Sequence, residues 1–206
     1  MDESVAQAIT VGDLPAVRIH EAVGVLSRGM RDNPIHVAAF GEGPERRRRC
    51  LEWMFTGLFR VMSAQTPLCA RDGETIVGVT GVAPPGHCQP AGTQRLRIVP
   101  FILAAGPRST GRVLKWIGAW AERDPEEPHV HLGPLAVDAH LQGRGIGSRI
   151  LAEHCRRLDE RGTLGYLETD KPENVRLYER FGYRVVAEAQ VIGVPCWFMR
   201  REPSSS

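Results

Sequence analysis

The feature that most constrains the fold is a glycine-rich turn, Gln142-Gly143-Arg144-Gly145-Ile146-Gly147-Ser148, which lies between an apolar strand pattern and an amphipathic helix pattern. After the turn, Ile146, Ile150 and Leu151 recur at helical spacing. Glycines at a helix start let a ligand approach the backbone, and the unpaired N–H groups and positive dipole end there favour an anion. A plain tight turn is the alternative, but three glycines so close together favour phosphate binding.

Two familiar nucleotide sites fit this turn poorly. A Walker loop requires Gly-Lys-Ser/Thr, which does not follow here. A dinucleotide-binding domain would use Glu168, at the end of the next expected strand, for a ribose contact. However, Ser148 occupies the third glycine position of that motif, and residues 169–206 are too few for the second half of a doubly wound domain.

Hydrophobic periodicity around the turn predicts alternating strands and helices. The expected elements are a strand over 129–137, a helix over 143–161, a strand over 165–169 and a helix over 172–181, followed by strands over 183–191 and 194–200. Upstream we expect a strand over 4–11, two amphipathic helices and a hairpin turning at Asp72-Gly73. Residues 93–123 are expected to form two helices inserted before the strand at 129. One α/β (α+β) domain over 1–206 follows from this alternation.

Composition narrows the class of protein. The formal net charge of +2 lacks the basic surplus of a nucleic-acid binder, and the run Arg46-Arg47-Arg48-Arg49 is interpreted as the solvated face of a helix. Five widely spaced cysteines without a C-x-x-C pair predict neither a disulfide framework nor a zinc site. The acidic start lacks a secretory signal and no segment is long enough to span a bilayer, so a cytoplasmic protein without membrane contact is expected.

Two motifs together resemble the GCN5-related N-acetyltransferase (GNAT) superfamily. Gln142 to Gly147 matches its Q/R-x-x-G-x-G/A motif. At the usual spacing, Glu168-Thr169 and then Asn174 to Tyr183 resemble its strand-5 and helix-4 signature. The resemblance covers roughly residues 129–185. It implies a mixed twisted sheet of about six to seven strands flanked by helices, with a splay between strands 4 and 5. Gly133-Pro134 is expected to mark the bulge that opens it, because proline cannot donate to a sheet ladder.

The resemblance also implies acetyl-CoA as cosubstrate, with no metal. Backbone groups of Leu135, Ala136 and Val137 would contact the pantetheine and the thioester. The pyrophosphate would lie on residues 142–148, and Arg144 either adds charge there or faces solvent. Asn174 would contact the pantetheine, cap its helix, or do both. The cosubstrate-binding residues expected on this basis are Leu135, Ala136, Val137, Gln142, Gly143, Arg144, Gly145, Ile146, Gly147, Ser148 and Asn174.

The same resemblance implies transfer of an acetyl group to a primary amine by direct attack in a ternary complex. Tyr178 matches the family's general acid, with core packing as the alternative. Glu168, His131 or water would deprotonate the amine, and His129 and His131 are expected to share one face of their strand. A non-catalytic acyl-CoA-binding module with the same fold is the alternative function.

The acceptor is expected to be a small-molecule amine, or a peptide, but no residue selects among such substrates. By resemblance it would lie between residues 30–44 and 189–195, with Phe40, Asn33 and Trp197 as lining residues. The helices at 93–123 would cover the acceptor, pack in the core through Trp116 and Trp120, or use these tryptophans in a homodimer contact.

Overall fold

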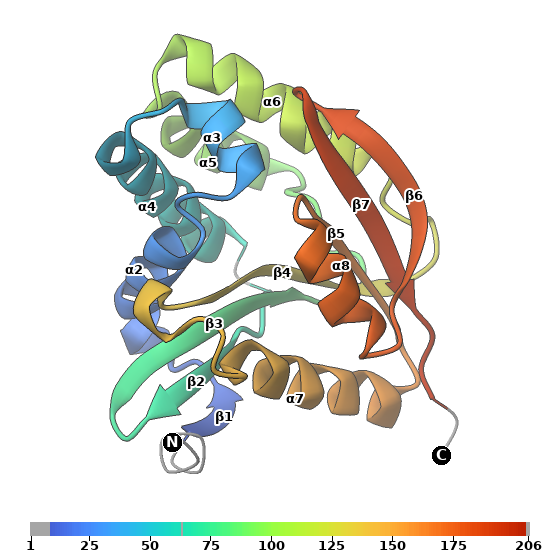
Figure 1. Cartoon of the computed structure of the whole chain (residues 1–206). Helices are drawn as coiled ribbons and strands as arrows, with labels where there is room; N and C mark the ends of the chain where they lie inside the picture. The colour runs from blue at the N-terminus through green and yellow to red at the C-terminus, as the bar shows by residue number, and fades with distance from the viewer. Residues whose placement is uncertain (1–8, 63, 205–206) are drawn as a thin grey trace.

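The computed structural model describes residues 9–62 and 64–204. Over these residues the chain forms a seven-stranded sheet with strand order β1-β2-β3-β4-β5-β7-β6, seen in Figure 1. The strands are β1 (Ile9–Asp13), β2 (Leu68–Asp72), β3 (Thr75–Ala83), β4 (His129–Val137), β5 (Leu164–Thr169), β6 (Arg184–Val191) and β7 (Val194–Arg201). Only β4 and β5 run parallel among the pairs in this described sheet. The predicted mixed sheet is confirmed.

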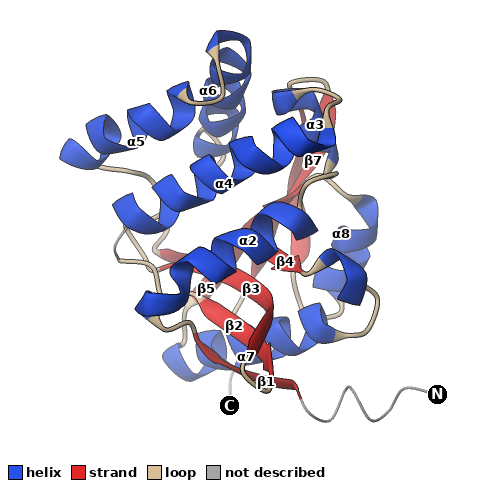
Figure 2. Cartoon of the chain, turned by 90° about the vertical axis from the view of Figure 1, so that its left-hand side faces the viewer, coloured by secondary structure: helices blue, strands red, loops and turns tan. Residues whose placement is uncertain are grey.

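Helices cover both faces of the sheet. The helices that precede β4 lie on one face and those that follow β4 lie on the other. Figure 2 shows α2 and α4 crossing in front of the strands. One face carries α2 (Ile19–Gly29), α3 (Pro34–Phe40), α4 (Pro44–Val61), α5 (Thr93–Leu103) and α6 (Pro107–Ala121), and the other carries α7 (Ile146–Arg161) and α8 (Pro172–Glu179). None of the helices in the described part of the chain combines the length and apolar character that a bilayer-spanning segment needs.

Two hydrophobic clusters hold these layers together. On the α7 side, Ile150 and Leu151 are fully buried against the inner strands, with Tyr183 beneath them. On the α2 side, Leu26, Leu51 and other apolar residues of the long helices pack on β3 and β7. Each side chain of this size that leaves water contributes about 1.5–3 kcal/mol, so the amphipathic stripes of the helices fix their placement on the sheet.

Several predicted boundaries are wrong in instructive ways. The helix after the glycine turn begins at Ile146 rather than Gly143, because Gly143 and Gly145 have φ of 79° and 77°, outside the helical region. Residues 34–40 form α3, a short helix that the sequence did not predict. Pro34 stands at the start of that helix, where its missing N–H costs nothing. The first predicted strand, 4–11, lies largely outside the described residues, and its described part belongs to β1.

The arginine run is only partly a solvated face, which corrects the prediction. Arg47 is buried, and its guanidinium donates to the carbonyls of Arg31 (3.0 Å) and Gly41 (2.8 Å) and pairs with Asp32 (2.5 Å). Arg46 reaches across to the Ala105 carbonyl between α5 and α6 (2.8 Å). Arginine's fixed fork of donors suits it to satisfying several carbonyls at once. These two residues therefore attach α4 to its neighbouring segments.

Stability is expected to fall in mild acid because His154 of α7 is buried uncharged. Burial, followed by the charges of Arg201 and Arg157, lowers the pKa of His154 to about 4, against about 6.5 in an unfolded chain. Between these values the unfolded chain binds the additional proton. Stability is therefore fully present above about pH 6.5 and is lost as the pH falls toward 4, by roughly 3 kcal/mol for this group.

Urea denaturation at several pH values checks this expectation. His154→Gln should flatten the dependence of the unfolding free energy on pH between about 6.5 and 4. His87→Ala, which removes an exposed imidazole, serves as the matched control and should keep the wild-type slope. Parallel curves for His154→Gln and the wild-type protein would show that the buried imidazole does not cause the acid sensitivity.

Candidate functional site

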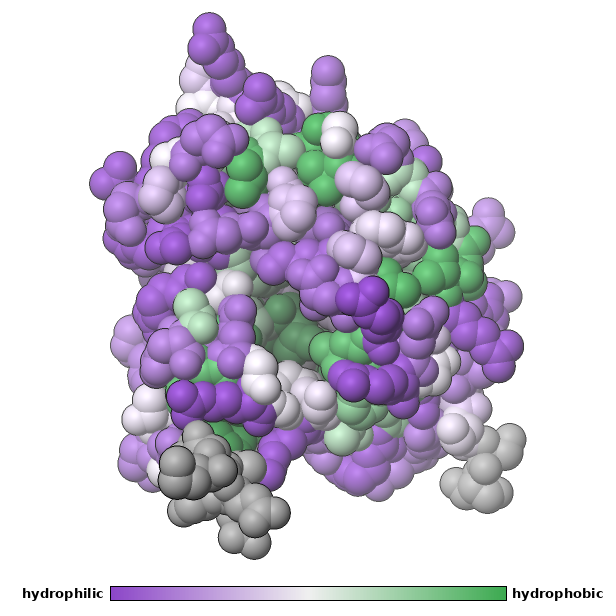
Figure 3. Space-filling view, viewed as in Figure 1, coloured by the Kyte–Doolittle hydropathy of each residue, from purple (hydrophilic) through white to green (hydrophobic). Residues whose placement is uncertain are grey.

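The sheet opens at its centre, between β4 and β5. These strands pair in parallel only from His129–Leu164 to His131–Tyr166, although β4 continues to Val137 and β5 to Thr169. The opening begins at Gly133-Pro134, and the β3 register shifts opposite it, between Thr80 and Val82. The predicted bulge and splay are confirmed. Figure 3 shows a hollow with an apolar floor on this face, between the regions of β4 and α8.

Backbone groups of β4 point into this opening. The N–H of Asp138 donates to the Val77 carbonyl of β3 (2.9 Å). Because successive residues of a strand direct their N–H and C=O groups to opposite sides, Ala136 also faces β3, whereas Leu135 and Val137 face the side that β5 has left. The splay therefore directs the N–H groups of Leu135 and Val137 and the carbonyl of Leu135 at the gap, whereas the Val137 carbonyl accepts from Gln142 (3.1 Å).

The glycine turn continues from the end of β4 into α7. Gly143 and Gly145 have left-handed backbone conformations, and a Cβ at either position would meet open space. Ile146 is buried and anchors the first turn of α7, while Gly147 and Ser148 are partly exposed beside it. The backbone N–H groups that begin α7 thus stand at an accessible helix N-terminus, an arrangement suited to an anion.

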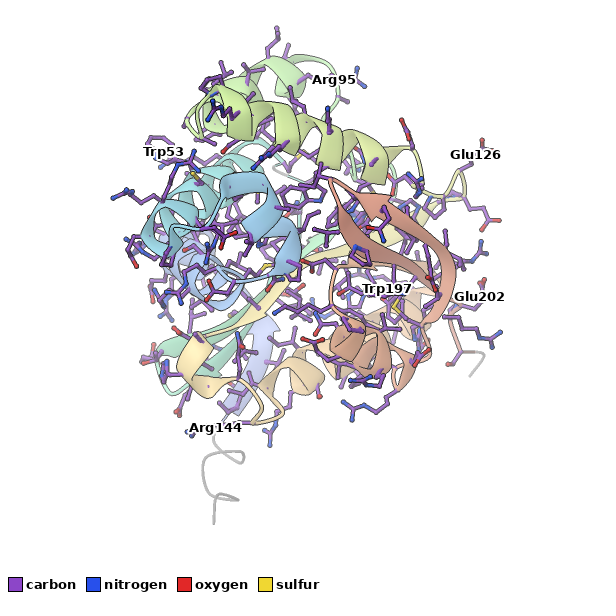
Figure 4. All side chains as sticks on the ribbon, turned by 45° about the horizontal axis from the view of Figure 1, so that its top comes forward. Trp53, Arg95, Glu126, Arg144, Trp197 and Glu202 are labelled. Atoms are coloured by element: carbon purple, nitrogen blue, oxygen red, sulfur yellow. The ribbon has the colours of Figure 1, made fainter. Side chains whose placement is uncertain are left out.

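Two polar side chains of the turn have different surroundings. Gln142 donates to the carbonyls of Gly29 (3.0 Å) and Val137 (3.1 Å), so it fastens the turn to the ends of α2 and β4. Arg144 is exposed, and Figure 4 places it at the outer edge of the molecule. The structure therefore gives Gln142 a positioning contact, whereas Arg144 lies on the solvent side of the loop.

The end of α2 supports the same corner. The Arg28 guanidinium pairs with the Asp138 carboxylate at 2.6 Å. Burial opposes ionisation of Asp138, but the hydrogen bonds and charge of Arg28 outweigh it and lower the pKa of that carboxyl. Gly29 has no side chain to hold α2 away from the strand, and a Cβ there would overlap the Val137 carbonyl oxygen and Ala136.

A second group of polar residues lies where the two strands part. The His131 Nε2 atom and the Glu168 carboxylate are 2.8 Å apart, and both side chains are largely buried. Burial opposes protonation of His131, but the neighbouring carboxylates of Glu168 and Asp124 outweigh it and raise the pKa of His131 well above its usual value. His129 lies on the same face as His131, as strand alternation predicts, with ring centroids 6.2 Å apart.

The two residues predicted on the last helix of the motif lie on α8, next to the end of β5. Tyr178 is buried, with its ring 6.0 Å from that of Tyr183. Burial and the neighbouring carboxylates Asp170 and Glu168 raise its pKa, so it remains a phenol at neutral pH. Asn174 donates to the Thr169 hydroxyl (3.3 Å). Because Lys171 is the N-cap of α8, the predicted capping role of Asn174 is wrong.

One cluster was not expected from the sequence. Cys88, Asp124, His129 and His131 each offer one possible metal-ligand atom, and these four atoms lie within 4.8 Å of one another. Cys88 precedes α5 and Asp124 follows α6, so their sequence separation hides their proximity. Only the alternation of the two histidines on β4 could have hinted at it.

Both segments that were predicted to border the acceptor contribute to a surface groove. This groove is bounded by Asp32, Val37, Gly41 and Glu42 around α3, by Arg112 of α6 and by Ile192 of the β6–β7 hairpin. The three lining residues suggested from the sequence are not among them. Phe40 and Asn33 are buried, and Trp197, labelled on β7 in Figure 4, packs with the cluster on the α7 side. Trp116 is also buried, and the centroid of its ring lies 5.2 Å from that of the Trp120 ring.

Comparisons with known proteins agree with this geometry. The sequence model of the acetyltransferase (GNAT) family matches residues 33–183. A Corynebacterium glutamicum structure described as histone acetyltransferase HPA2 and related acetyltransferase superposes with a TM-score of 0.72 at 21% identity, covering 97% of this chain and 98% of that one. The polyamine N-acetyltransferase of Drosophila melanogaster superposes with a TM-score of 0.67 at 16% sequence identity, covering 94% of this chain and 99% of that one. Arylalkylamine N-acetyltransferase 2 of Aedes aegypti superposes with a TM-score of 0.65 at 12% sequence identity, covering 95% of this chain and 99% of that one.

A buried carboxylate connects the strand end to the acceptor side. Asp170 accepts a hydrogen bond from the Ile35 backbone N–H in the first turn of α3 (2.7 Å). Asp170→Ala should therefore leave that N–H unpaired and lower the free energy of unfolding by about 1–2 kcal/mol. Chemical denaturation measures the change, and Asp72→Ala, at an exposed strand end, is the control. Equal stability of Asp170→Ala and the wild-type protein would mean that α3 does not depend on this contact.

Proposed function

The chain belongs to the acetyltransferase (GNAT) family, and we propose that it is an acetyl-CoA-dependent N-acetyltransferase. The acetyl group would pass directly to a primary amine while both substrates are bound. The observation that carries this proposal is the opening between β4 and β5 beside a glycine turn that begins a helix. An elongated ligand with an anionic centre fits that combination, because the splay presents backbone groups to its arm and the helix N-terminus favours its phosphates.

The cosubstrate is proposed to lie along this opening. Amide groups of Leu135 and Val137 would bind the pantetheine and the thioester, with Ala136 maintaining the pairing to β3 between them. N–H groups of residues 143–148 would hold the pyrophosphate. An amide that faces the splay at the thioester carbonyl would also stabilise the oxyanion as the amine attacks. Asn174 would orient the chain end that borders the pantetheine, through its contact with Thr169.

Glu168 is the proposed general base, acting on the attacking ammonium directly or through one water. Its carboxylate lies at the opening, and His131 holds one of its oxygens. Because the Nε2 atom of His131 is directed at the Glu168 carboxylate, we assign the imidazole the role of positioning Glu168. The proton leaves the nitrogen, the carbon–sulfur bond of the tetrahedral intermediate breaks, and the thiolate takes a proton from Tyr178.

The acceptor is proposed to be a cationic small molecule, with a peptide amine as the alternative. The groove beside α3 carries the carboxylates of Asp32 and Glu42 at its rim. Arg31 and Arg47 lower the pKa of Asp32 to about 2 but also compensate its charge, and Arg112 borders the groove, so Glu42 is the carboxylate there that is left to pair with a cation. The similar structures include a polyamine and an arylalkylamine N-acetyltransferase, which supports this class of acceptor.

A non-catalytic acyl-CoA-binding module is the second candidate. Tyr178 on α8 and Glu168 on β5, beyond the last β5 residue that pairs with β4, support an enzyme. Binding of acetyl-CoA without acetyl transfer to a broad panel of amines, including polyamines and arylalkylamines, would instead support the module.

Acetyl-CoA should stabilise the protein against heat. At about 100 times its Kd, a ligand adds roughly 2.7 kcal/mol, which raises the Tm of a chain of this size by about 5–10 °C. Gly145→Glu should abolish the shift, because it places a negative side chain at the proposed phosphate site. Gly106→Glu is the matched control, since Gly106 has a similar φ (84°) at the start of α6, also with open space around a Cβ. NAD and ATP should give no comparable shift.

Two outcomes of the thermal-shift experiment would contradict these assignments. Absence of a shift at millimolar acetyl-CoA, in folded protein initially free of CoA, would overturn the proposed cosubstrate. An equal shift in Gly145→Glu would leave the cosubstrate but remove the assignment of the turn.

Tyr178→Phe should lower kcat while leaving the affinity for acetyl-CoA nearly unchanged. A thiol with a pKa near 8.5 already leaves tolerably as the thiolate, so the loss should be modest for general acid catalysis, about tenfold to a hundredfold. Free-thiol release in the presence of an accepted amine measures it. Tyr183→Phe is the control, because its hydroxyl contacts His154 (3.1 Å) in the core. Unchanged turnover in Tyr178→Phe would exclude the general-acid role.

A further inference from the structure

Four side chains converge at the base of the helical segment between β3 and β4. The Cys88 Sγ atom lies 3.3 Å from His129 Nε2. Asp124 Oδ1 lies 3.3 Å from the same nitrogen and 3.5 Å from His131 Nδ1. These four atoms are the ones that gather within 4.8 Å of one another. The cluster therefore has one sulfur, two imidazole nitrogens and one carboxylate oxygen around a single point.

The spacing matches the edges of a tetrahedral metal site. Zinc lies about 2.0–2.3 Å from nitrogen, oxygen and sulfur ligands, so neighbouring ligand atoms are separated by about 3.3–3.8 Å. Three of the six separations, at 3.3, 3.3 and 3.5 Å, agree with these edges, and all six lie within 4.8 Å. Moreover, Asp124 Oδ1 and His131 Nδ1 are buried and have no hydrogen-bond partner among the described residues. A cation at the centre would satisfy both atoms, which otherwise incur the cost of unpaired burial.

The surrounding hydrogen bonds leave the correct atoms available. His131 Nε2 lies 2.8 Å from Glu168, and His129 Nδ1 lies 2.9 Å from the Glu127 carbonyl. With those nitrogens donating, the opposite nitrogen of each ring is a lone-pair donor aimed at the cluster. Gln89 donates to Asp124 Oδ2 (3.2 Å), which turns Oδ1 inward. Histidine ligands of zinc are commonly oriented by such carboxylate and carbonyl acceptors.

We propose that Cys88, Asp124, His129 and His131 bind a zinc ion. Thiolate, imidazole and carboxylate are its usual ligands, and four protein ligands make a closed, structural site. Cys88 lies just before α5 (Thr93–Leu103) and Asp124 just after α6 (Pro107–Ala121). The ion would therefore fasten both ends of this helical segment to β4. Binding releases the proton of the Cys88 thiol.

The proposed zinc site also touches the proposed active site. A zinc-bound His131 presents its Nε2–H to Glu168, and the metal fixes the tautomer and the ring orientation. His131 is then a positioning residue, and Glu168 is the group left to accept the proton of the amine. This link rests on the proposed function, whereas zinc binding itself does not.

Metal binding is tested on the full chain, without acetyl-CoA and after removal of any affinity tag. Metal analysis of purified protein, and titration of chelator-treated protein with Zn²⁺, should give about one ion per chain. Titration with Co²⁺ should produce the visible absorption of a tetrahedral site and a thiolate-to-cobalt charge-transfer band. Cys88→Ser should lose that band, and Asp124→Asn should weaken binding at least about tenfold.

Matched variants separate the cluster from non-specific binding. His87→Ala removes an exposed imidazole beside Cys88, and Cys50→Ser removes a buried thiol on α4, so both should bind like the wild-type protein. Glu168→Gln should weaken the affinity by about 10–100-fold if Glu168 orients His131. Folded wild-type protein that binds neither metal, or Cys88→Ser that retains the charge-transfer band, would overturn the site. An unchanged metal affinity in Glu168→Gln would overturn the proposed link between the zinc site and Glu168.

A structural readout guards against variants that fail to fold. Amide hydrogen exchange of the wild-type protein should slow in residues 84–92 and 122–128 when Zn²⁺ is added, because the ion joins these two segments. Exchange in the β6–β7 hairpin should not change. Equal exchange with and without bound zinc would show that the ion does not fasten the helical segment. None of these results depends on acetyl transfer, so zinc binding and the proposed function fail independently.

Discussion

The short parallel pairing of β4 with β5 is the constraint from which the rest of the site follows. Pairing stops after His131 and Tyr166, and the Gly133-Pro134 bulge turns the remainder of β4 away from β5. The break leaves unpaired backbone groups in the middle of a sheet, where they would ordinarily be costly. A ligand that accepts and donates along the gap offsets that cost, so the discontinuity has the properties of a binding surface. The Arg28–Asp138 pair and the contacts of Gln142 hold its open corner in place.

Much of this arrangement could be predicted from the sequence, because the signals are local. The strand at 129–137, the glycine turn and the stripe of α7 are adjacent in the chain, and the proline after Gly133 marked the bulge. What failed depends on contacts distant in sequence. The short helix α3 is held by Asp170, which lies 135 positions from Ile35, so the local sequence did not indicate this helix. Arg46 and Arg47 looked like a solvated face until the carbonyls they bind were visible.

The zinc cluster shows the same limitation in a stronger form. Cys88 and Asp124 are separated by two helices, and only folding brings their side chains to the two histidines of β4. No spacing rule for zinc ligands covers such a set. Because the cluster lies at both ends of the α5–α6 segment, a bound ion would hold that segment against β4. The contact of His131 with Glu168 would connect the ion to the proposed catalytic base. The α5–α6 segment, the metal ion and the proposed base Glu168 would then meet where β4 and β5 part.

The central claim is that the cosubstrate occupies the gap between β4 and β5. Amide hydrogen exchange with and without acetyl-CoA tests it most directly, because it reports on individual backbone groups. We expect slower exchange at Leu135, Val137 and residues 143–148, with little change around α3 until an amine is added. Protection confined to the groove beside α3, or no protection at the β4 and α7 positions at saturating acetyl-CoA, would contradict it.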